Sequence, residues 1–549
     1  MNDKRGTMWA AILGSCIVFL DSTVVGVALP RIGHELPAHL VGVLEGQSYV
    51  YNGYLLAESA FLILMGGLGD LHGRRRMFIV GLIAFGAASL LSGLAPSMEW
   101  LVVFRVIQGL AGAILVPGSL ALITATFSGE EQGRAFGVWS GASAGLAILG
   151  PFIGGVLVDG VSWRAVFLLN VPLVLTGLWV TTRYVRESTN TEVSGGFDVT
   201  GTFLTGLAVG GLVIGTIAGQ QRNWQSPAAY VALGAGAAAA VLLPFWMLRA
   251  RNPLVPPALF RSRNFTVTNL STLVIYAALS ATFYYLTLFL QGTLGYSAAG
   301  TGIAMAPGAV FMALFSPRFG ALATRYGARW FMAGGPAIMC LGVLWLARIP
   351  AASSAWALRL SDAATLAPPA SYLIDVLPGM VIFGVGAMIM VAPLTATLMA
   401  SAPVEHAGVA SAINTVISDV GPQLAVAGLF VAVTAHFYAA LAPDPGATAA
   451  ALQVSPFNQP PPSVPDAVRA AAREASAGAL HLAMLVSSAL LVCGAAINAA
   501  GIRTPARPAS QRAAKVVSPD PSYRRYCHLT VERVKRRAEA AHSGAAERG

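Results

Sequence analysis

The chain has 549 residues, of which 56% are hydrophobic and 11% charged, with a formal net charge of +10. Soluble proteins carry about 25% charged residues, so this composition excludes a soluble globular protein and predicts a polytopic membrane protein. The apolar runs are about 20 residues long, which predicts helices rather than the ~10-residue strands of a membrane barrel. The excess positive charge lies in loops and in the C-terminal tail, where membrane topology accounts for it without nucleic-acid binding.

The apolar runs, taken in chain order, predict fourteen membrane-spanning helices. These spans lie near residues 9–29, 47–68, 77–95, 99–123, 135–158, 164–182, 199–218, 228–248, 266–291, 299–323, 330–347, 373–399, 408–437 and 479–501. Lysine and arginine gather in alternate loops, beginning with Lys4, Arg5 and the run 74–76. The positive-inside rule places those loops in the cytoplasm, so both termini are expected there, as an even number of spans requires.

Two segments outside the spans have distinct compositions. Residues 438–478 are rich in alanine and proline and are expected to form an external loop. Residues 503–549 form a polar tail with basic clusters. The stretch 523–541 could lie on anionic lipid as an amphipathic helix, although a solvated tail is the interpretation we favour.

An ionisable side chain lies in the first predicted span. Asp21 is about thirteen residues into the run 9–29, which places it near the bilayer midplane at ~1.5 Å of rise per residue. A charge at that depth costs roughly 2.5–3.5 kcal/mol on insertion scales. Asp21 therefore predicts a pathway for a proton or an ion. The structural alternative is a protonated aspartate that is hydrogen-bonded to a neighbouring helix.

The loop after the second span has the pattern Gly-x-Leu-x-Asp-x-x-Gly-Arg-Arg, with Gly66, Asp70, Gly73, Arg74 and Arg75 at its fixed positions. Glycine permits a tight turn and a close approach of helices. An aspartate can cap a facing helix N-terminus, and arginines anchor the loop to the cytoplasmic face. We expect this loop to form a cytoplasmic gate.

Two further spans contain notable residues. Arg105 is a cation inside the fourth span and is tolerable only if it faces a cavity or pairs with an acid. The fifth span contains Gly150, Pro151, Gly154 and Gly155, which allow a kink and close helix packing.

Several segments resemble motifs of the major facilitator superfamily. The loop 66–76 is similar to the signature between its second and third spans, and residues 317–327 repeat it weakly. Residues 105–112 are similar to the intramembrane arginine motif, and residues 150–155 resemble the motif of its antiporters. The segments that resemble the fourteen-span drug:proton antiporter family are 20–30, 163–172 and 393–399.

The resemblance implies an all-α major facilitator fold with two six-helix bundles and two inserted spans. The corresponding parts are residues 1–190 (first bundle), 191–262 (inserted spans and linker), 263–502 (second bundle) and 503–549 (basic tail). By analogy, Arg105 would help to relay protonation, with a structural ion pair as the alternative. Residues 150–155 would seal the carrier against leak, although simple helix packing explains the same glycines.

Two more acids fall on spans that line the central cavity in that fold. Glu58 is halfway along the second span, and Asp419 is in the thirteenth. Both depart from the residue usual in the family and make the cavity more acidic, which favours a cationic cargo. Tyr276 and Phe283 are candidates for an aromatic wall against that cargo.

These observations predict a proton-coupled antiporter that exports small hydrophobic or cationic compounds, such as drugs, by alternating access. Asp21, Glu58, Arg105 and Asp419 would carry protons or bind substrate. The alternatives are a dedicated exporter of one endogenous metabolite or antibiotic, and a non-transporting sensor or scaffold. No nucleophile–base arrangement, Walker A motif or metal-ligand spacing is visible in the sequence, so we expect no enzyme activity, cofactor or metal. We expect a monomer in the bacterial cytoplasmic membrane.

Overall fold

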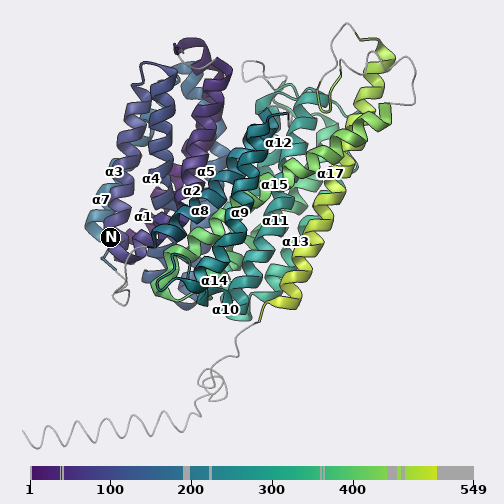
Figure 1. Cartoon of the computed structure of the whole chain (residues 1–549). Coiled ribbons are helices and arrows are strands. Elements are labelled where there is room, and N and C mark those ends of the chain that lie inside the picture. The colour runs from purple at the N-terminus through teal and green to yellow at the C-terminus, as the bar shows by residue number, and fades with distance from the viewer. Residues whose placement is uncertain are drawn as a thin grey trace, which may run out of the picture. The chain divides into compact units, whose positions relative to one another are not determined.

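The structure is a computed structural model. It describes residues 3–37, 39, 43–188, 198–221, 225–358, 362, 365–441, 454–458 and 464–503. Every regular element in these ranges is helical (Figure 1). Contacts divide the chain into two units, residues 1–503 and 504–549. The predicted basic tail from residue 504 onward lies outside the described residues.

The first seven helices occupy residues 3–184, which we call the N-terminal half. They are α1 (Asp3–Glu35), α2 (Val43–His72), α3 (Arg74–Gly93), α4 (Met98–Thr126), α5 (Gly129–Gly160), α6 (Arg164–Leu168) and α7 (Asn170–Tyr184). Two helices and a short turn follow, namely α8 (Val199–Gln221), α9 (Pro227–Arg249) and α10 (Ala258–Arg261).

The remaining elements occupy residues 263–501, which we call the C-terminal half. They are α11 (Arg263–Leu288), η1 (Phe289–Leu294), α12 (Ala298–Tyr326), α13 (Arg329–Leu346), η3 (Tyr372–Val376), α14 (Leu377–Ala400), η4 (Val404–His406), α15 (Ala407–Leu441) and α17 (Asp466–Gly501). Helices α15 and α17 extend into the predicted external loop 438–478, so that segment is helical at both ends.

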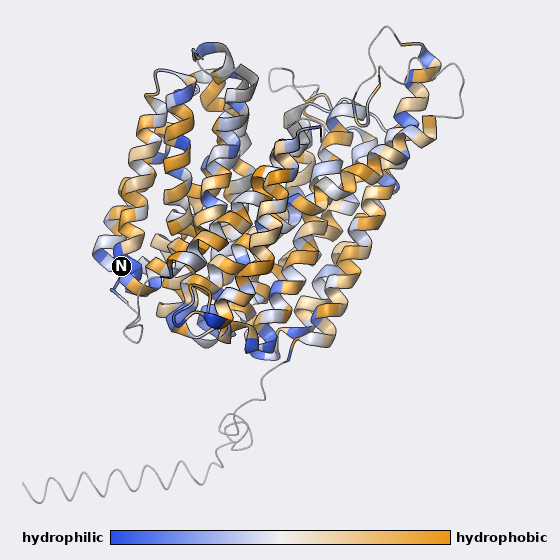
Figure 2. Ribbon diagram, in the orientation of Figure 1, coloured by the Kyte–Doolittle hydropathy of each residue, from blue (hydrophilic) through white to orange (hydrophobic). Residues whose placement is uncertain are grey.

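Thirteen helical segments of the described residues are long and apolar enough to cross a membrane. They coincide with thirteen of the predicted spans, and hydrophilic residues gather at the ends of the helices (Figure 2). The other predicted span, 135–158, lies within α5, which is not one of the thirteen. The all-helical polytopic fold is therefore confirmed, whereas the count of fourteen spans stays a prediction.

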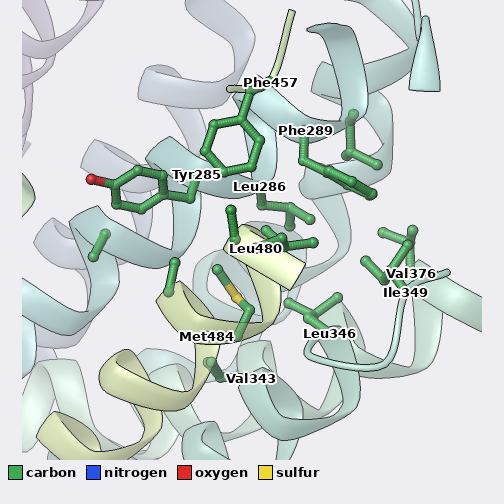
Figure 3. Packing of buried hydrophobic residues seen from close by; sticks show 14 of the residues in the cluster. Tyr285, Leu286, Phe289, Val343, Leu346, Ile349, Val376, Phe457, Leu480 and Met484 are labelled. Atoms are coloured by element: carbon green, nitrogen blue, oxygen red, sulfur yellow. The ribbon is translucent and has the colours of Figure 1, made fainter. Parts of the chain in front are cut away.

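One buried apolar cluster lies within each half, and a third joins side chains of α14 and α15 to the N-terminal half. In the C-terminal half, side chains of α11, α13 and α17 meet, including Leu286, Leu346 and Met484, and Phe457 from the described segment 454–458 packs against them (Figure 3). Burial of such side chains, together with satisfied backbone hydrogen bonds, fixes the helices side by side.

Two sets of helix contacts connect the two halves. Helix α5 packs against α12 and α14, while α15 packs against α2 and α4. Helices α8 and α9 pair with each other, and α8 also lies against α2 and α15, so the inserted pair flanks the junction. The predicted division of the chain into two separate bundles remains a proposal.

Candidate functional site

A buried ion pair joins α1 to α4. The Nη1 atom of Arg105 lies 2.5 Å from Oδ2 of Asp21, and both side chains are fully shielded from solvent. Gln108 Nε2 and Asn170 Nδ2 each donate a hydrogen bond to Oδ1 of Asp21, at 2.9 Å and 2.8 Å. Charges removed from water are tolerated only when further hydrogen bonds satisfy them. The network meets that requirement for the carboxylate.

The α2 helix closes the other side of the guanidinium. Arg105 Nε donates to the carbonyl oxygen of Val50 at 3.2 Å, and the Tyr54 ring stacks under the guanidinium with its centroid 4.1 Å from Cζ. The Nη2 atom has no hydrogen-bond partner among the described residues. One nitrogen of a fully buried cation, with its two N–H groups, is thus left for another acceptor.

The sequence singled out Asp21 and Arg105, and the structure brings them together. The contact is required by both interpretations of Arg105, a proton relay and a structural ion pair, and both stay predictions. Sequence reasoning missed Gln108 and Asn170 as partners of Asp21. Their signal was an amide inside an otherwise apolar span, a costly group that needs a hydrogen-bond partner.

The other two acids lie at the junction of the halves. Glu58 of α2 and Asp419 of α15 are both partly exposed, and their carboxylates interact electrostatically. Glu58 also lies beside the Tyr54 hydroxyl, and Asp419 lies near Tyr276. Neither acid forms a salt bridge within the part of the chain that the structure describes.

The two predicted wall residues have different surroundings. Tyr276 lies near the Asp419 carboxylate. Phe283 meets Phe383 edge to face at 5.3 Å and packs against the core of the C-terminal half. Tyr276 therefore has a neighbour suited to a substrate site, and Phe283 has the contacts of a core residue.

The predicted gate loop connects α2 to the start of α15. Arg74 Nη2 lies 2.9 Å from Oδ1 of Asp70 and also donates to the carbonyl oxygen of Val404. The Val409 amide donates to Oδ2 of Asp70 at 3.1 Å, so Asp70 caps a facing helix as its position suggested. Gly66 lies against Gly408, because a Cβ on Gly66 would be 2.6 Å from the Gly408 oxygen.

The rest of the loop holds the N-terminal half together. Gly73 has a φ of +106°, in the region that favours glycine. Arg75 reaches the end of α7, where its amide donates to Glu187 at 3.1 Å and its side chain donates to the Thr182 oxygen at 2.8 Å. Arg74 thus binds the C-terminal half, whereas Arg75 binds within the N-terminal half.

The glycines of the antiporter-like segment face α1. A Cβ on Gly150 would lie 1.9 Å from Thr23 Oγ1, and one on Gly154 would lie 3.1 Å from the Val24 oxygen. A Cβ on Gly155 would meet nothing within 4 Å. Pro151 is within α5, but its side chain lies outside the described residues. The segment therefore packs against the turn of α1 that follows Asp21. Both interpretations of the segment, a seal against leak and simple helix packing, require this contact.

Comparison with known proteins identifies the family. The sequence pattern described as the Major Facilitator Superfamily matches residues 11–426. The chain is 33% identical to the multidrug resistance protein Stp of Mycobacterium tuberculosis, over 80% of this chain and 77% of that protein. It is 32% identical to the tetracenomycin C resistance and export protein of Streptomyces glaucescens, over 78% and 76% of the two chains.

Solved structures agree on the fold. The human organic anion transporter MFSD10 superposes with a TM-score of 0.54 at 12% identity, over 89% of this chain and 99% of that one. The proton:xylose symporter XylE gives 0.52 at 15% identity, over 90% and 94%. With the family pattern and the two relatives, these results show that the chain belongs to the major facilitator superfamily, a family of membrane transporters.

Proposed function

We propose that this protein is a proton-coupled antiporter that exports small hydrophobic or cationic compounds by alternating access. The observation that carries the proposal is the buried Asp21–Arg105 pair, which puts a titratable carboxylate inside the membrane-spanning part of the N-terminal half. An intramembrane ionisable residue marks an ion or proton pathway by default. Relatives named for multidrug resistance and for antibiotic export support efflux as the direction.

Protonation of Asp21 would drive the cycle. A neutral carboxyl group no longer balances the Arg105 guanidinium, so the pair loses its main attraction and the α1–α4 contact can rearrange. In the same cycle, Glu58 and Asp419 hold a cationic substrate or a second proton at the junction of the halves. One proton crossing 100 mV supplies ~2.3 kcal/mol, which exceeds the ~1.4 kcal/mol of a tenfold concentration gradient.

The contacts of the gate loop would stabilise one of the end states of the transport cycle. Asp70, Arg74 and Gly66 hold α2 against the start of α15, at the end of the helices that we expect to face the cytoplasm. We propose that this packing closes the cytoplasmic side and that it separates when the substrate enters from within. In this proposal the carrier is a monomer of the bacterial cytoplasmic membrane, with both termini in the cytoplasm.

The test is export of a fluorescent lipophilic cation from inverted vesicles with an imposed pH gradient. Wild type should move the dye with the gradient, and Asp21→Asn should not. Asp466→Asn, at an exposed acid beyond the predicted spans, serves as the matched control and should behave as wild type. Equal gradient-driven transport by wild type and Asp21→Asn would contradict the role of Asp21.

A second candidate is a dedicated exporter of one metabolite. It is favoured by relatives named for a single compound, such as the tetracenomycin C resistance and export protein and the probable actinorhodin transporter of Streptomyces coelicolor. Competition separates the two candidates. Unrelated lipophilic cations should compete with one another for a multidrug carrier, whereas a dedicated exporter should leave all of them untransported.

A further inference from the structure

The segment between α9 and α11, residues 250–262, is held in place by an aspartate that precedes α8. We call this segment the linker. Asp198 Oδ1 accepts a hydrogen bond from the Trp246 indole at 2.9 Å, and its Oδ2 accepts one from the Leu254 amide at 3.0 Å. Trp246 belongs to the last turn of α9. One carboxylate therefore ties the linker to both inserted helices.

The linker also packs against α2, the helix that leads into the gate loop. Val255 and Leu259 are buried in an apolar cluster that contains side chains of α2, and Leu254 packs against the same cluster. A Cβ on Gly67 would lie 3.0 Å from Leu254 Cδ1. Gly67 follows Gly66, which forms the contact of α2 with α15. The course of the linker is thus fixed beside the contact that we propose closes the cytoplasmic side.

Three exposed arginines lie on the linker or directly beside it. Arg249 is the last residue of α9, and Arg251 and Arg261 are within the linker. None of the three forms a salt bridge among the residues that the structure describes. Arg263 differs from them, because its side chain donates to the Gly501 oxygen at 2.9 Å at the end of α17. The three exposed guanidinium groups, with five N–H donors each, can therefore serve an anion from outside the protein.

These arginines lie where two apolar helices reach the membrane surface. Both α9 and α11 are long and apolar enough to span a membrane, and the linker joins them. Leu248, beside Arg249, is 75% exposed, and Phe260, beside Arg261, is 41% exposed. The linker helix α10 lies at the end of the bundle at which α17 ends (Figure 1). Exposed apolar side chains next to arginines at the end of a span are suited to lipid headgroups and the adjoining acyl chains.

We propose that Arg249, Arg251 and Arg261 bind the phosphate headgroup of an anionic membrane lipid, with Phe260 against its acyl chain. Arginine binds phosphate oxygens through paired, charge-assisted hydrogen bonds, and the cytoplasmic leaflet carries the negative surface potential that attracts such clusters. A bound lipid holds the linker at the membrane surface, keeps Leu254 against α2 and so favours the closed cytoplasmic gate. The inference goes beyond the proposed export function and takes from it only the orientation of the chain and the role of the gate.

The first test measures lipid binding to the full-length protein, purified in a neutral detergent, by native mass spectrometry. Wild type should bind phosphatidylglycerol, which is anionic, more tightly than phosphatidylcholine, which has no net charge. Arg249→Gln, Arg251→Gln and Arg261→Gln should each weaken phosphatidylglycerol binding about fivefold, which corresponds to ~1 kcal/mol for one arginine near the surface. Binding of phosphatidylcholine should change much less. Added inorganic phosphate should not displace the lipid, because it lacks the acyl chain that contacts Phe260.

The matched control is an exposed arginine outside the linker. Arg134, in α5, also forms no salt bridge within the described part of the chain, so Arg134→Gln removes the same charge and should leave both lipid affinities unchanged. Gel filtration of each variant reports whether it is folded.

The second test measures the gate in lipid nanodiscs. Ala412→Cys, in a background without the native cysteines, places a thiol where α15 meets Gly66. Its labelling should be several-fold slower with phosphatidylglycerol in the bilayer than with phosphatidylcholine alone. The combined replacement of Arg249, Arg251 and Arg261 by glutamine should abolish this difference, and Arg134→Gln should retain it.

Four outcomes would overturn the lipid site: equal affinity for the two lipids, unchanged affinity in the three linker variants, an equal loss in Arg134→Gln, or displacement of the lipid by inorganic phosphate. Labelling that does not respond to phosphatidylglycerol would overturn the link to the gate. Neither test uses a substrate or a pH gradient, so these failures would leave the export proposal standing. Conversely, an absence of gradient-driven dye export would not alter the lipid affinities.

Discussion

Replacement of Asp21 by asparagine should destabilise the protein through a single contact. The Asp21 carboxylate accepts one hydrogen bond from Arg105 at its Oδ2 atom, and two at Oδ1, from Gln108 and Asn170. An asparagine amide can place its oxygen at only one of these positions. With the oxygen kept toward the two amides, its NH₂ group faces the Arg105 Nη1 donor, and the buried guanidinium loses its countercharge.

The magnitude follows from the burial of both partners. Removal of one member of a buried ion pair costs about 3–5 kcal/mol, since the other charge is left uncompensated. We expect Asp21→Asn to lower the free energy of unfolding by about that amount. Arg105→Gln should cost a similar amount, because it strands the carboxylate. The double variant Asp21→Asn with Arg105→Gln leaves no buried charge, so its loss should be smaller than the sum of the two by about 1–3 kcal/mol.

The assay is equilibrium unfolding by SDS in mixed micelles for wild type, both single variants and the double variant. Asp375 accepts a hydrogen bond from Ser353 Oγ at 2.8 Å near the surface, so Asp375→Asn provides a matched control and should cost no more than about 1.5 kcal/mol. Losses that add within about 0.5 kcal/mol in the double variant would refute the pairing of Asp21 with Arg105.

Three more predictions concern the gate and the tail. Gly73→Ala forces a positive φ on alanine and puts its Cβ 2.8 Å from the Glu187 carboxylate, so it should cost about 1–3 kcal/mol; an unchanged melting temperature would contradict this. Asp70→Asn weakens the cap on α15 and should raise thiol labelling of a cysteine placed at the buried Ala412 several-fold, whereas no change would mean that the gate does not depend on the cap. Deletion of residues 504–549, the predicted basic tail, should leave dye export intact; loss of export would favour the sensor or scaffold alternative.

Much of the fold could be predicted because the membrane restricts the choices. Backbone groups in hydrocarbon must bond within their own segment, so a run of about 20 apolar residues has few structures available. The predicted span 99–123 accordingly lies within α4. The ends were less predictable: α15 continues to Leu441 and α17 begins at Asp466, because a helix with a packed face need not end where the hydrophobic layer ends.

The charged residues of the site could be predicted from the sequence, but not which of them pair with one another. A charge inside an apolar span is visible in the sequence because it is costly there, and this property selected Asp21, Glu58, Arg105 and Asp419. Which acid meets the arginine depends on how helices distant in sequence pack. Arg105 is 84 positions from Asp21 and 47 from Glu58, and the spacing alone does not favour one over the other.

The pairing that the structure selects divides the acids into two kinds. Asp21 has a resident countercharge inside the N-terminal half, whereas Glu58 and Asp419 interact across the junction and form no salt bridge among the described residues. A change in the charge of an acid with a fixed partner alters a contact inside one half. Two acids on opposite halves are suited to a ligand that both halves must hold. The proposed antiporter needs both tasks, and their separation would let cargo and proton compete through the conformation of α2, which carries Tyr54 under Arg105 and Glu58 at the junction.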